Sequence, residues 1–199
     1  MSVFDSLPTG QAGLRLTNEN ILGYLLYIMQ ELWSPWRSQY IDSFKDKTPK
    51  NGCLLCDCSK LNADHADNLL VQKGKLTFTI LNLYPYNNGH LMIVPYGHKA
   101  DLLSLSKDEN LEIMEQLKLS VRALEEVLKP EGFNIGVNIG KASGAGIDDH
   151  IHYHIVPRWN GDTNFMPVLG EVKVISQDLL ATKKNLQSAF KKLSKETKL

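Results

Sequence analysis

The sequence predicts an α+β domain with a mostly antiparallel sheet of about five strands, one long helix and a C-terminal helix. Short apolar segments bounded by turn residues indicate the strands. Two longer segments with apolar residues at helical spacing indicate the helices. These segments follow one another as three strands, the long helix, two strands and the last helix. That order is typical of an α+β domain rather than of a parallel sheet.

The elements can be placed in chain order. The five expected strands cover residues 69–72, 76–81, 91–94, 133–139 and 150–156. Turns at Lys73-Gly74-Lys75 and Asn87-Asn88-Gly89 separate the first three. The long helix begins after the capping-box pattern Ser106-Lys107-Asp108-Glu109 and ends at Lys129-Pro130. Residues 177–196 form a lysine-rich amphipathic helix with one solvated face.

The length of 199 residues fits one domain with appended ends. We expect a poorly ordered extension at 1–28, the domain at 29–176 and the C-terminal helix at 177–199. The apolar run at 21–28 is too short for a membrane span, which needs about 20 residues. It also lacks the features of a signal peptide, and the natural protein is expected to begin near Met29.

Charge and cysteine content restrict the partners and the compartment. The 22 basic and 22 acidic residues cancel, so neither a nucleic acid nor a membrane is expected as a partner. The three cysteines are clustered in Cys53-Leu54-Leu55-Cys56-Asp57-Cys58, which is not the pattern of a disulfide framework. We therefore expect a reduced, cytoplasmic setting.

The most informative motif is His150-Ile151-His152-Tyr153-His154-Ile155-Val156. In a strand, alternate side chains point to opposite faces, so one face is apolar and the other presents three imidazoles about 6–7 Å apart. Imidazole acts as base, nucleophile or metal ligand near neutral pH. The glycine-rich loop at 136–146 could cradle phosphate oxygens with its backbone N–H groups. Together the two features suggest phosphorus chemistry, and a metalloenzyme that uses all three histidines stays open as an alternative.

The histidine motif resembles the signature of the histidine triad (HIT) superfamily. The resemblance extends to Leu81-Asn82-Leu83-Tyr84-Pro85 and to the block from Asn88-Gly89-His90 through Pro95 and His98, and it covers roughly Trp33 to Ile175. The segments Leu32–Arg37 and Arg158–Val168 further resemble the diadenosine polyphosphate hydrolase and phosphorylase branch. The resemblance implies a HIT-like fold, a nucleotide or dinucleoside polyphosphate substrate, and a homodimer or larger assembly.

The resemblance implies a nucleotidyl-transfer mechanism. His152 would attack the α-phosphorus of a nucleotide, and water or inorganic phosphate would release the product. The backbone carbonyl of His150 would hold the other ring nitrogen of His152 as N–H. His154 and His90 would stabilise charge on the non-bridging oxygens, and Gly89 beside His90 would let a ligand approach.

The implied nucleotide contacts lie outside the triad. Asn82 would bind ribose hydroxyls, with capping of the following turn as its alternative. Asn138 would contact the phosphate or the ribose. Gly144 and Gly146 would contribute backbone N–H groups from the glycine-rich loop.

The segment Ala145-Gly146-Ile147-Asp148-Asp149 departs from the family pattern. It is one residue shorter than usual and lacks the Gln and Ser/Thr that assist the leaving group, so Asp148, Ser143 or the loop backbone would have to replace them. This departure keeps a nucleotide-binding protein with little catalysis open as an alternative. A histidine at position 154, rather than Gln, favours hydrolysis, but the branch also contains phosphorolytic enzymes with three histidines.

The cysteines pose a separate question. Several HIT proteins resemble this chain in pairing a Cys-x-x-Cys, here Cys53 and Cys56, with the positions of His98 and His150. Those four ligands would form a closed tetrahedral site, so the zinc would be structural and no catalytic cofactor is expected. The alternative is that the thiols are small buried residues.

Overall fold

The computed structural model describes residues 52–66, 68–163 and 178–196. The expected extension at 1–28, the expected start near Met29 and the end of the Arg158–Val168 segment lie outside the described residues.

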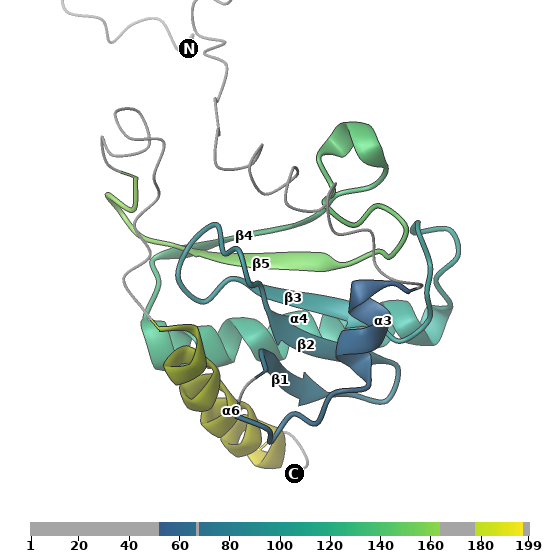
Figure 1. Ribbon diagram of the computed structural model, residues 1–199. Coiled ribbons are helices and arrows are strands. Elements are labelled where there is room, and N and C mark those ends of the chain that lie inside the picture. Colours follow the sequence, from purple (N-terminus) through teal and green to yellow (C-terminus); the bar gives the residue numbers. More distant parts are fainter. Residues whose placement is uncertain (1–51, 67, 164–177, 197–199) are drawn as a thin grey trace, which may run out of the picture. The chain divides into compact units, whose positions relative to one another are not determined.

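The described strands form a single antiparallel sheet (Figure 1). They are β1 (Leu70–Lys73), β2 (Thr77–Leu81), β3 (Leu91–Pro95), β4 (Gly132–Val137) and β5 (Tyr153–Arg158). Their order across the sheet is β1-β2-β3-β5-β4, and every neighbouring pair is antiparallel. The predicted α+β class and its antiparallel sheet are confirmed.

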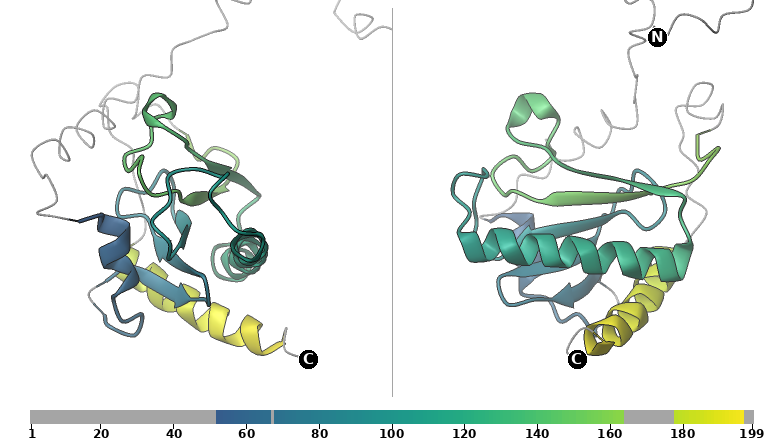
Figure 2. Two further views of the ribbon diagram at one scale, coloured as in Figure 1. Left: turned by 90° about the vertical axis from the view of Figure 1, so that its right-hand side faces the viewer. Right: turned by 180° about the vertical axis from the view of Figure 1, so that it is seen from behind.

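Helices cover both faces of the sheet to different extents. They are α3 (Leu54–Ser59), α4 (Lys107–Leu128) and α6 (Leu179–Glu196), with a short 3-10 helix at Lys141–Ser143. Figure 2 shows α4 running along one face, with α6 beside it and near β1, while α3 lies against the opposite face. None of the helices in the described part of the chain is long and apolar enough to cross a membrane.

The face toward α4 and α6 holds the larger core. Ile93, Ile113, Ile155 and Phe190 are buried there, together with Ile151. The smaller cluster on the other face joins α3 to the sheet, with Leu55, Phe78 and Val94 among its buried residues. Ile151 and Ile155 point into the larger core, so the residues that alternate with them lie on the face away from α4.

The predicted capping box at the start of α4 is present. The Ser106 hydroxyl accepts a hydrogen bond from the Glu109 N–H at 3.2 Å, and the Glu109 carboxylate accepts one from the Ser106 N–H at 2.7 Å. Glu109 also accepts from the Lys99 ammonium at 2.5 Å, and these bonds lower the pKa of Glu109. The start of α4 is thereby tied to the residue that follows His98.

One element was not predicted and one boundary was wrong. No element was predicted at the cysteines, but Leu54–Ser59 forms α3. The histidine strand was expected over 150–156, but β5 begins at Tyr153. The pairing between β3 and β5 ends at Ile93 and Tyr153. Beyond this pair, Pro95 of β3 has no N–H to donate, and its carbonyl accepts a hydrogen bond from the His150 ring at 2.9 Å. The Ile151 N–H donates instead to the Lys99 carbonyl at 2.6 Å.

Candidate active site

The three triad histidines lie on the face of the sheet away from α4, as the alternation predicts. All are buried, with exposed fractions of 0% for His150, 6% for His152 and 8% for His154. The strand pairing places His154 between Met92 of β3 and Gly136 of β4. Only His154 is within β5, because His150 and His152 belong to the extended segment that leads into the strand.

The ring of His152 is oriented by a single backbone hydrogen bond. Its Nδ1 lies 2.8 Å from the carbonyl oxygen of His150. A carbonyl only accepts, so Nδ1 carries the proton and Nε2 holds the lone pair. Burial lowers the pKa of His152, and the bond to the carbonyl partly opposes that shift. The ring is therefore a neutral imidazole near pH 7, with Nε2 as its nucleophilic atom.

His154 is coupled to a fourth buried histidine, His90. The His90 Nε2 lies 2.9 Å from the His154 Nδ1. The His154 ring also meets the His152 ring edge to face, with their centroids 4.8 Å apart. The rings of His90, His152 and His154 are thus brought together, while the ring of His150 packs against that of His98 and only its carbonyl contacts His152.

Asn82 lies next to His90, at the end of β2. Its Oδ1 accepts a hydrogen bond from the Tyr84 N–H at 2.9 Å, which is the turn cap considered as the alternative role. Its Nδ2 lies 3.4 Å from the His90 Nδ1. Asn82 therefore shapes the loop that carries His90, whether or not it also binds ribose.

The other expected nucleotide contacts lie at the end of β4 and in the following loop. Val137 and Tyr153 form the last pair between β4 and β5, and Asn138 and His152 are the next residues beyond that pair. Gly144 ends the short 3-10 helix with a φ of 81°, a left-handed conformation that glycine adopts without strain. Gly146 follows in the same loop, which returns the chain to His150.

The candidate replacements for the missing leaving-group residues have partners within the loop. The Ser143 hydroxyl donates to the Gly140 carbonyl at 2.7 Å, and one Asp148 carboxylate oxygen lies 4.0 Å from the Lys141 ammonium. Lys141 is the only cation paired with Asp148 among the ion pairs of the described residues. The loop before the triad therefore carries one positive charge, on Lys141, and one negative charge, on Asp148.

The structure shows a packing role for Gly89. A side chain at Gly89 would collide with Leu128 and Leu124 of α4, and its φ is +72°. Gly89 therefore allows α4 to pack closely under the loop that carries His90, and a side chain here would point toward α4.

Sequence patterns did not indicate the residues that anchor the loop between β2 and β3. Asn87 donates through Nδ2 to the Pro157 carbonyl at 3.0 Å and to the Asp162 carboxylate at 2.8 Å. Arg158 donates to both oxygens of Asp162, at 2.6 and 2.9 Å, and holds the pKa of that carboxyl well below its usual range. Asn87 and Asp162 are 75 residues apart, so no local pattern could have paired them.

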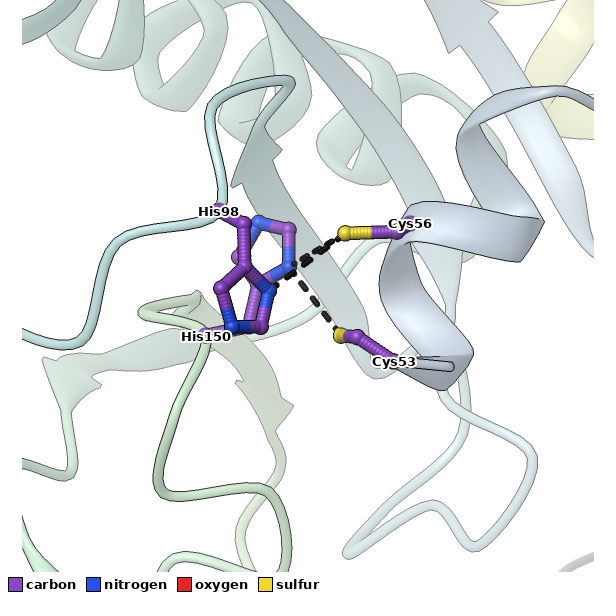
Figure 3. Close-up of side chains that lie close together, drawn as sticks. All are labelled: Cys53, Cys56, His98 and His150. Carbon is purple, nitrogen blue, oxygen red and sulfur yellow. Dashed lines mark hydrogen bonds between the residues drawn. The ribbon is translucent and has the colours of Figure 1, made fainter. Parts of the chain in front are cut away.

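The expected metal ligands converge in the structure. Among the described residues, the ligand atoms of Cys53, Cys56, His98 and His150 lie within 4.8 Å of one another. Figure 3 shows Cys53, the N-cap residue of α3, and Cys56, within α3, facing the two histidine rings. The His150 Nδ1 lies 3.3 Å from the Cys53 sulfur and 3.5 Å from the Cys56 sulfur, and the His98 Nδ1 lies 3.4 Å from the Cys56 sulfur.

These distances fit a tetrahedral zinc ion. Zinc–sulfur bonds of about 2.3 Å and zinc–nitrogen bonds of about 2.0–2.1 Å place the two kinds of ligand about 3.5 Å apart. The His150 Nε2 donates to the Pro95 carbonyl, which leaves Nδ1 as a lone pair. Two thiols point at this one acceptor, and a cation with two thiolates satisfies that arrangement better than one S–H hydrogen bond does.

The antiparallel α+β sheet and the buried histidine row are those of a histidine triad protein. Residues 63–161 match the HIT domain, and the chain belongs to the HIT family. It is 37% identical over 167 residues to the AP-4-A phosphorylase of Mycobacterium tuberculosis (strain CDC 1551 / Oshkosh). The aligned region covers 81% of this chain and 85% of that protein.

Two further relatives support this assignment. Adenosine 5'-monophosphoramidase hnt1 of Schizosaccharomyces pombe is 29% identical over 108 residues, or 54% of this chain and 75% of that protein. A Zn-bound histidine triad family protein from Mycobacterium smegmatis superposes with a TM-score of 0.59 at 25% identity, covering 73% of this chain and 97% of that one. The expected family and the expectation of a HIT-type enzyme are confirmed.

Proposed function

We propose that this chain cleaves dinucleoside polyphosphates such as diadenosine tetraphosphate by transferring a nucleotidyl group to His152 and then to inorganic phosphate. The observation that carries the proposal is the 2.8 Å hydrogen bond from the His152 Nδ1 to the His150 carbonyl, which leaves Nε2 as the nucleophile. The 37% identity to an AP-4-A phosphorylase supports both the substrate class and phosphate as the acceptor.

In the first step, the His152 Nε2 attacks the α-phosphorus. A phosphorus–nitrogen bond forms while the phosphorus–oxygen bond to the leaving group breaks, so diadenosine tetraphosphate releases ATP and leaves AMP on the histidine. The imidazole becomes positively charged, and the His150 carbonyl stabilises its Nδ1–H. His154 stabilises charge on the non-bridging oxygens, Asn82 and Asn138 contact the nucleotide, and Gly144 and Gly146 contact the phosphates.

In the second step, an oxygen of inorganic phosphate attacks the same phosphorus. The phosphorus–nitrogen bond breaks, ADP forms and His152 returns to the neutral state. Water in place of phosphate would give AMP instead of ADP. The products therefore distinguish phosphorolysis from hydrolysis.

The test is turnover of diadenosine tetraphosphate with and without phosphate. We expect ATP and ADP only when phosphate is present, and we expect His152→Ala to lower kcat by roughly 10⁴-fold or more. His65→Ala is the matched control, because His65 is exposed and outside the site. Equal turnover by His152→Ala and the unchanged protein would exclude His152 as the nucleophile. AMP without phosphate dependence would overturn the acceptor, and nucleotide binding without products would support the binding-protein alternative.

We further propose a structural zinc ion held by Cys53, Cys56, His98 and His150, a homodimeric assembly and a cytoplasmic location. The ligand distances and the Zn-bound structural relative support the zinc site. Four protein ligands leave no open position for catalysis. The cluster includes His150 but neither His152 nor His154, so the described residues do not favour a metalloenzyme that uses all three triad histidines.

The homodimer and the compartment have separate support. The edge strand β4 presents Ile135 with 49% of its surface exposed, which a second copy would cover. The three free cysteines are consistent with a reducing compartment.

A further inference from the structure

Tyr86 contacts both histidines of the His90–His154 pair. It is in the loop between β2 and β3, four residues before His90. Its backbone N–H donates to the His90 Nδ1 at 3.1 Å. Its ring centroid lies 4.7 Å from that of His90 and 5.9 Å from that of His154, with interplanar angles of 38° and 30°.

The backbone contact determines where the protons of the pair are located. An amide N–H can only donate, so the His90 Nδ1 must hold a lone pair and the His90 Nε2 must carry the proton. That proton is directed at the His154 Nδ1, 2.9 Å away, which must also hold a lone pair. The proton of His154 is therefore on Nε2. Adding a proton to either Nδ1 would break one of these two bonds, so the arrangement favours two neutral rings.

The side chain of Tyr86 covers the pair. Tyr86 keeps 38% of its surface exposed, whereas His90 is fully buried at 0% and His154 is 8% exposed. The phenol ring packs against both imidazoles and is more exposed than either, so it reduces the access of water to the bond between them. Water at this bond would compete for both ring nitrogens and permit the other tautomers.

The position of Tyr86 is fixed by its neighbour Asn87, which is 6% exposed and is bound to the Pro157 carbonyl and to Asp162. The His90 N–H in turn donates to the Asn87 carbonyl at 3.2 Å. Tyr86 is therefore held next to an anchored residue, and its contacts with the histidines do not depend on a substrate.

We propose that Tyr86 is a positioning residue for the nucleotidyl transfer. Its amide sets a single tautomer in His90 and His154, and its ring shields the pair. As a result, His154 presents a neutral Nε2–H donor to the phosphate, and His90 acts through His154 instead of contacting the phosphate itself. This inference rests on the proposed function, and it adds a residue to the site that the triad motif does not include.

The first test is the protonation of the two rings in the protein without substrate. Long-range nitrogen–proton NMR spectra of ¹⁵N-labelled protein distinguish protonated from unprotonated ring nitrogens. We expect His90 and His154 each to carry one proton, on Nε2, at neutral pH. A proton on either Nδ1, or a doubly protonated ring, would overturn the proposal. This result does not depend on turnover, so it stands even if the proposed function fails.

The second test is kinetic and compares Tyr86→Leu with Tyr86→Phe. We expect Tyr86→Leu to lower kcat about 10- to 100-fold with KM changed less than about threefold, because the donor is misplaced while substrate binding remains. Tyr86→Phe keeps the ring and is expected to restore most of the loss. An unchanged kcat in Tyr86→Leu, or an equal loss in Tyr86→Phe, would overturn the role of the ring. Thermal unfolding of both variants checks that each is folded.

Discussion

Each triad histidine is oriented by a different hydrogen bond. His150 donates from Nε2 to the Pro95 carbonyl, His152 donates from Nδ1 to the His150 carbonyl, and His154 accepts at Nδ1 from His90. The other ring nitrogen of each histidine therefore faces a different region. For His150 this is the cysteine cluster, and for His152 and His154 it is the proposed phosphate site. Three side chains of one type, at one spacing, therefore acquire three different roles from their hydrogen-bond partners.

The pH dependence of turnover follows from His152. Burial lowers its pKa below 6.5, and only the neutral ring can attack phosphorus. The sign is therefore definite, since the nucleophile is still neutral at a pH where an ordinary histidine is half protonated. We expect kcat/KM to stay level from about pH 8 down to about pH 6.5 and to fall only at lower pH.

The measurement is kcat/KM for diadenosine tetraphosphate across this range with phosphate saturating. Circular dichroism at each pH separates loss of the nucleophile from loss of the fold. If kcat/KM instead fell with a midpoint above pH 6.5, the lowered pKa of His152 would not account for the pH dependence.

At the scale of elements, the loop between β2 and β3 depends on its contact with α4. Gly89 has a φ of +72°, and a Cβ atom there would collide with Leu128 and Leu124. We expect Gly89→Ala to destabilise the protein by about 2–3 kcal/mol or more, because overpacking adds to backbone strain. His90 is next in the chain, so turnover is expected to fall as well.

Urea unfolding checks this prediction, with Gly132→Ala as the matched control. Gly132 begins β4, has no positive φ, and has no atom within 4 Å of an added Cβ. Its substitution is expected to change stability by less than about 0.5 kcal/mol. Similar losses in the two variants would show that the loss of a glycine, and not the contact with α4, is responsible.

Sequence patterns located elements whose signals are local. The strands, the capping box of α4 and the amphipathic α6 were all predicted, because each depends on neighbouring residues. The strand ends are shifted by at most two residues, except that β5 begins three residues later than expected. The six-residue α3 was missed because only Leu55 in it is buried, so it carries no periodic apolar pattern. The start of β5 was misplaced because it depends on Pro95, which is distant in the sequence.

In the site too, features with a local sequence signal were predicted, and contacts between distant residues were not. Alternation predicted that the three histidines share a face, and the family resemblance supplied the His150 carbonyl as the partner of His152. Neither could reveal the ring packing of Tyr86 or the bonds that join Asn87 to Asp162, because these contacts arise only after the loop between β2 and β3 folds back over the sheet.

At the scale of the whole molecule, the cysteine cluster joins parts of the chain that are far apart. Cys53 and Cys56 belong to or border α3, which packs on the smaller core, and they lie 97 and 94 residues before His150. His98 follows β3, and His150 lies in the segment that leads to His152. A metal ion in this cluster would cross-link α3, the end of β3 and the segment of the nucleophile.

Zinc should therefore contribute to stability and to the geometry of His152. We expect about one zinc ion per chain in protein purified without chelator, and its loss in Cys53→Ala. At free zinc 100-fold above its Kd, binding adds about 2.7 kcal/mol to the free energy of unfolding, so Cys53→Ala should unfold at lower temperature. Turnover should also fall, because the His150 carbonyl orients His152.

Cys58→Ala is the matched control, because Cys58 lies on the same helix but outside the four-residue cluster. It should retain the zinc and most of the thermal stability. Metal analysis and thermal unfolding of the three proteins, before and after treatment with a chelator, measure both effects. Equal zinc in Cys53→Ala and the unchanged protein would place the metal elsewhere. Zinc loss without any change in unfolding temperature would show that the cluster binds metal but does not hold the fold together.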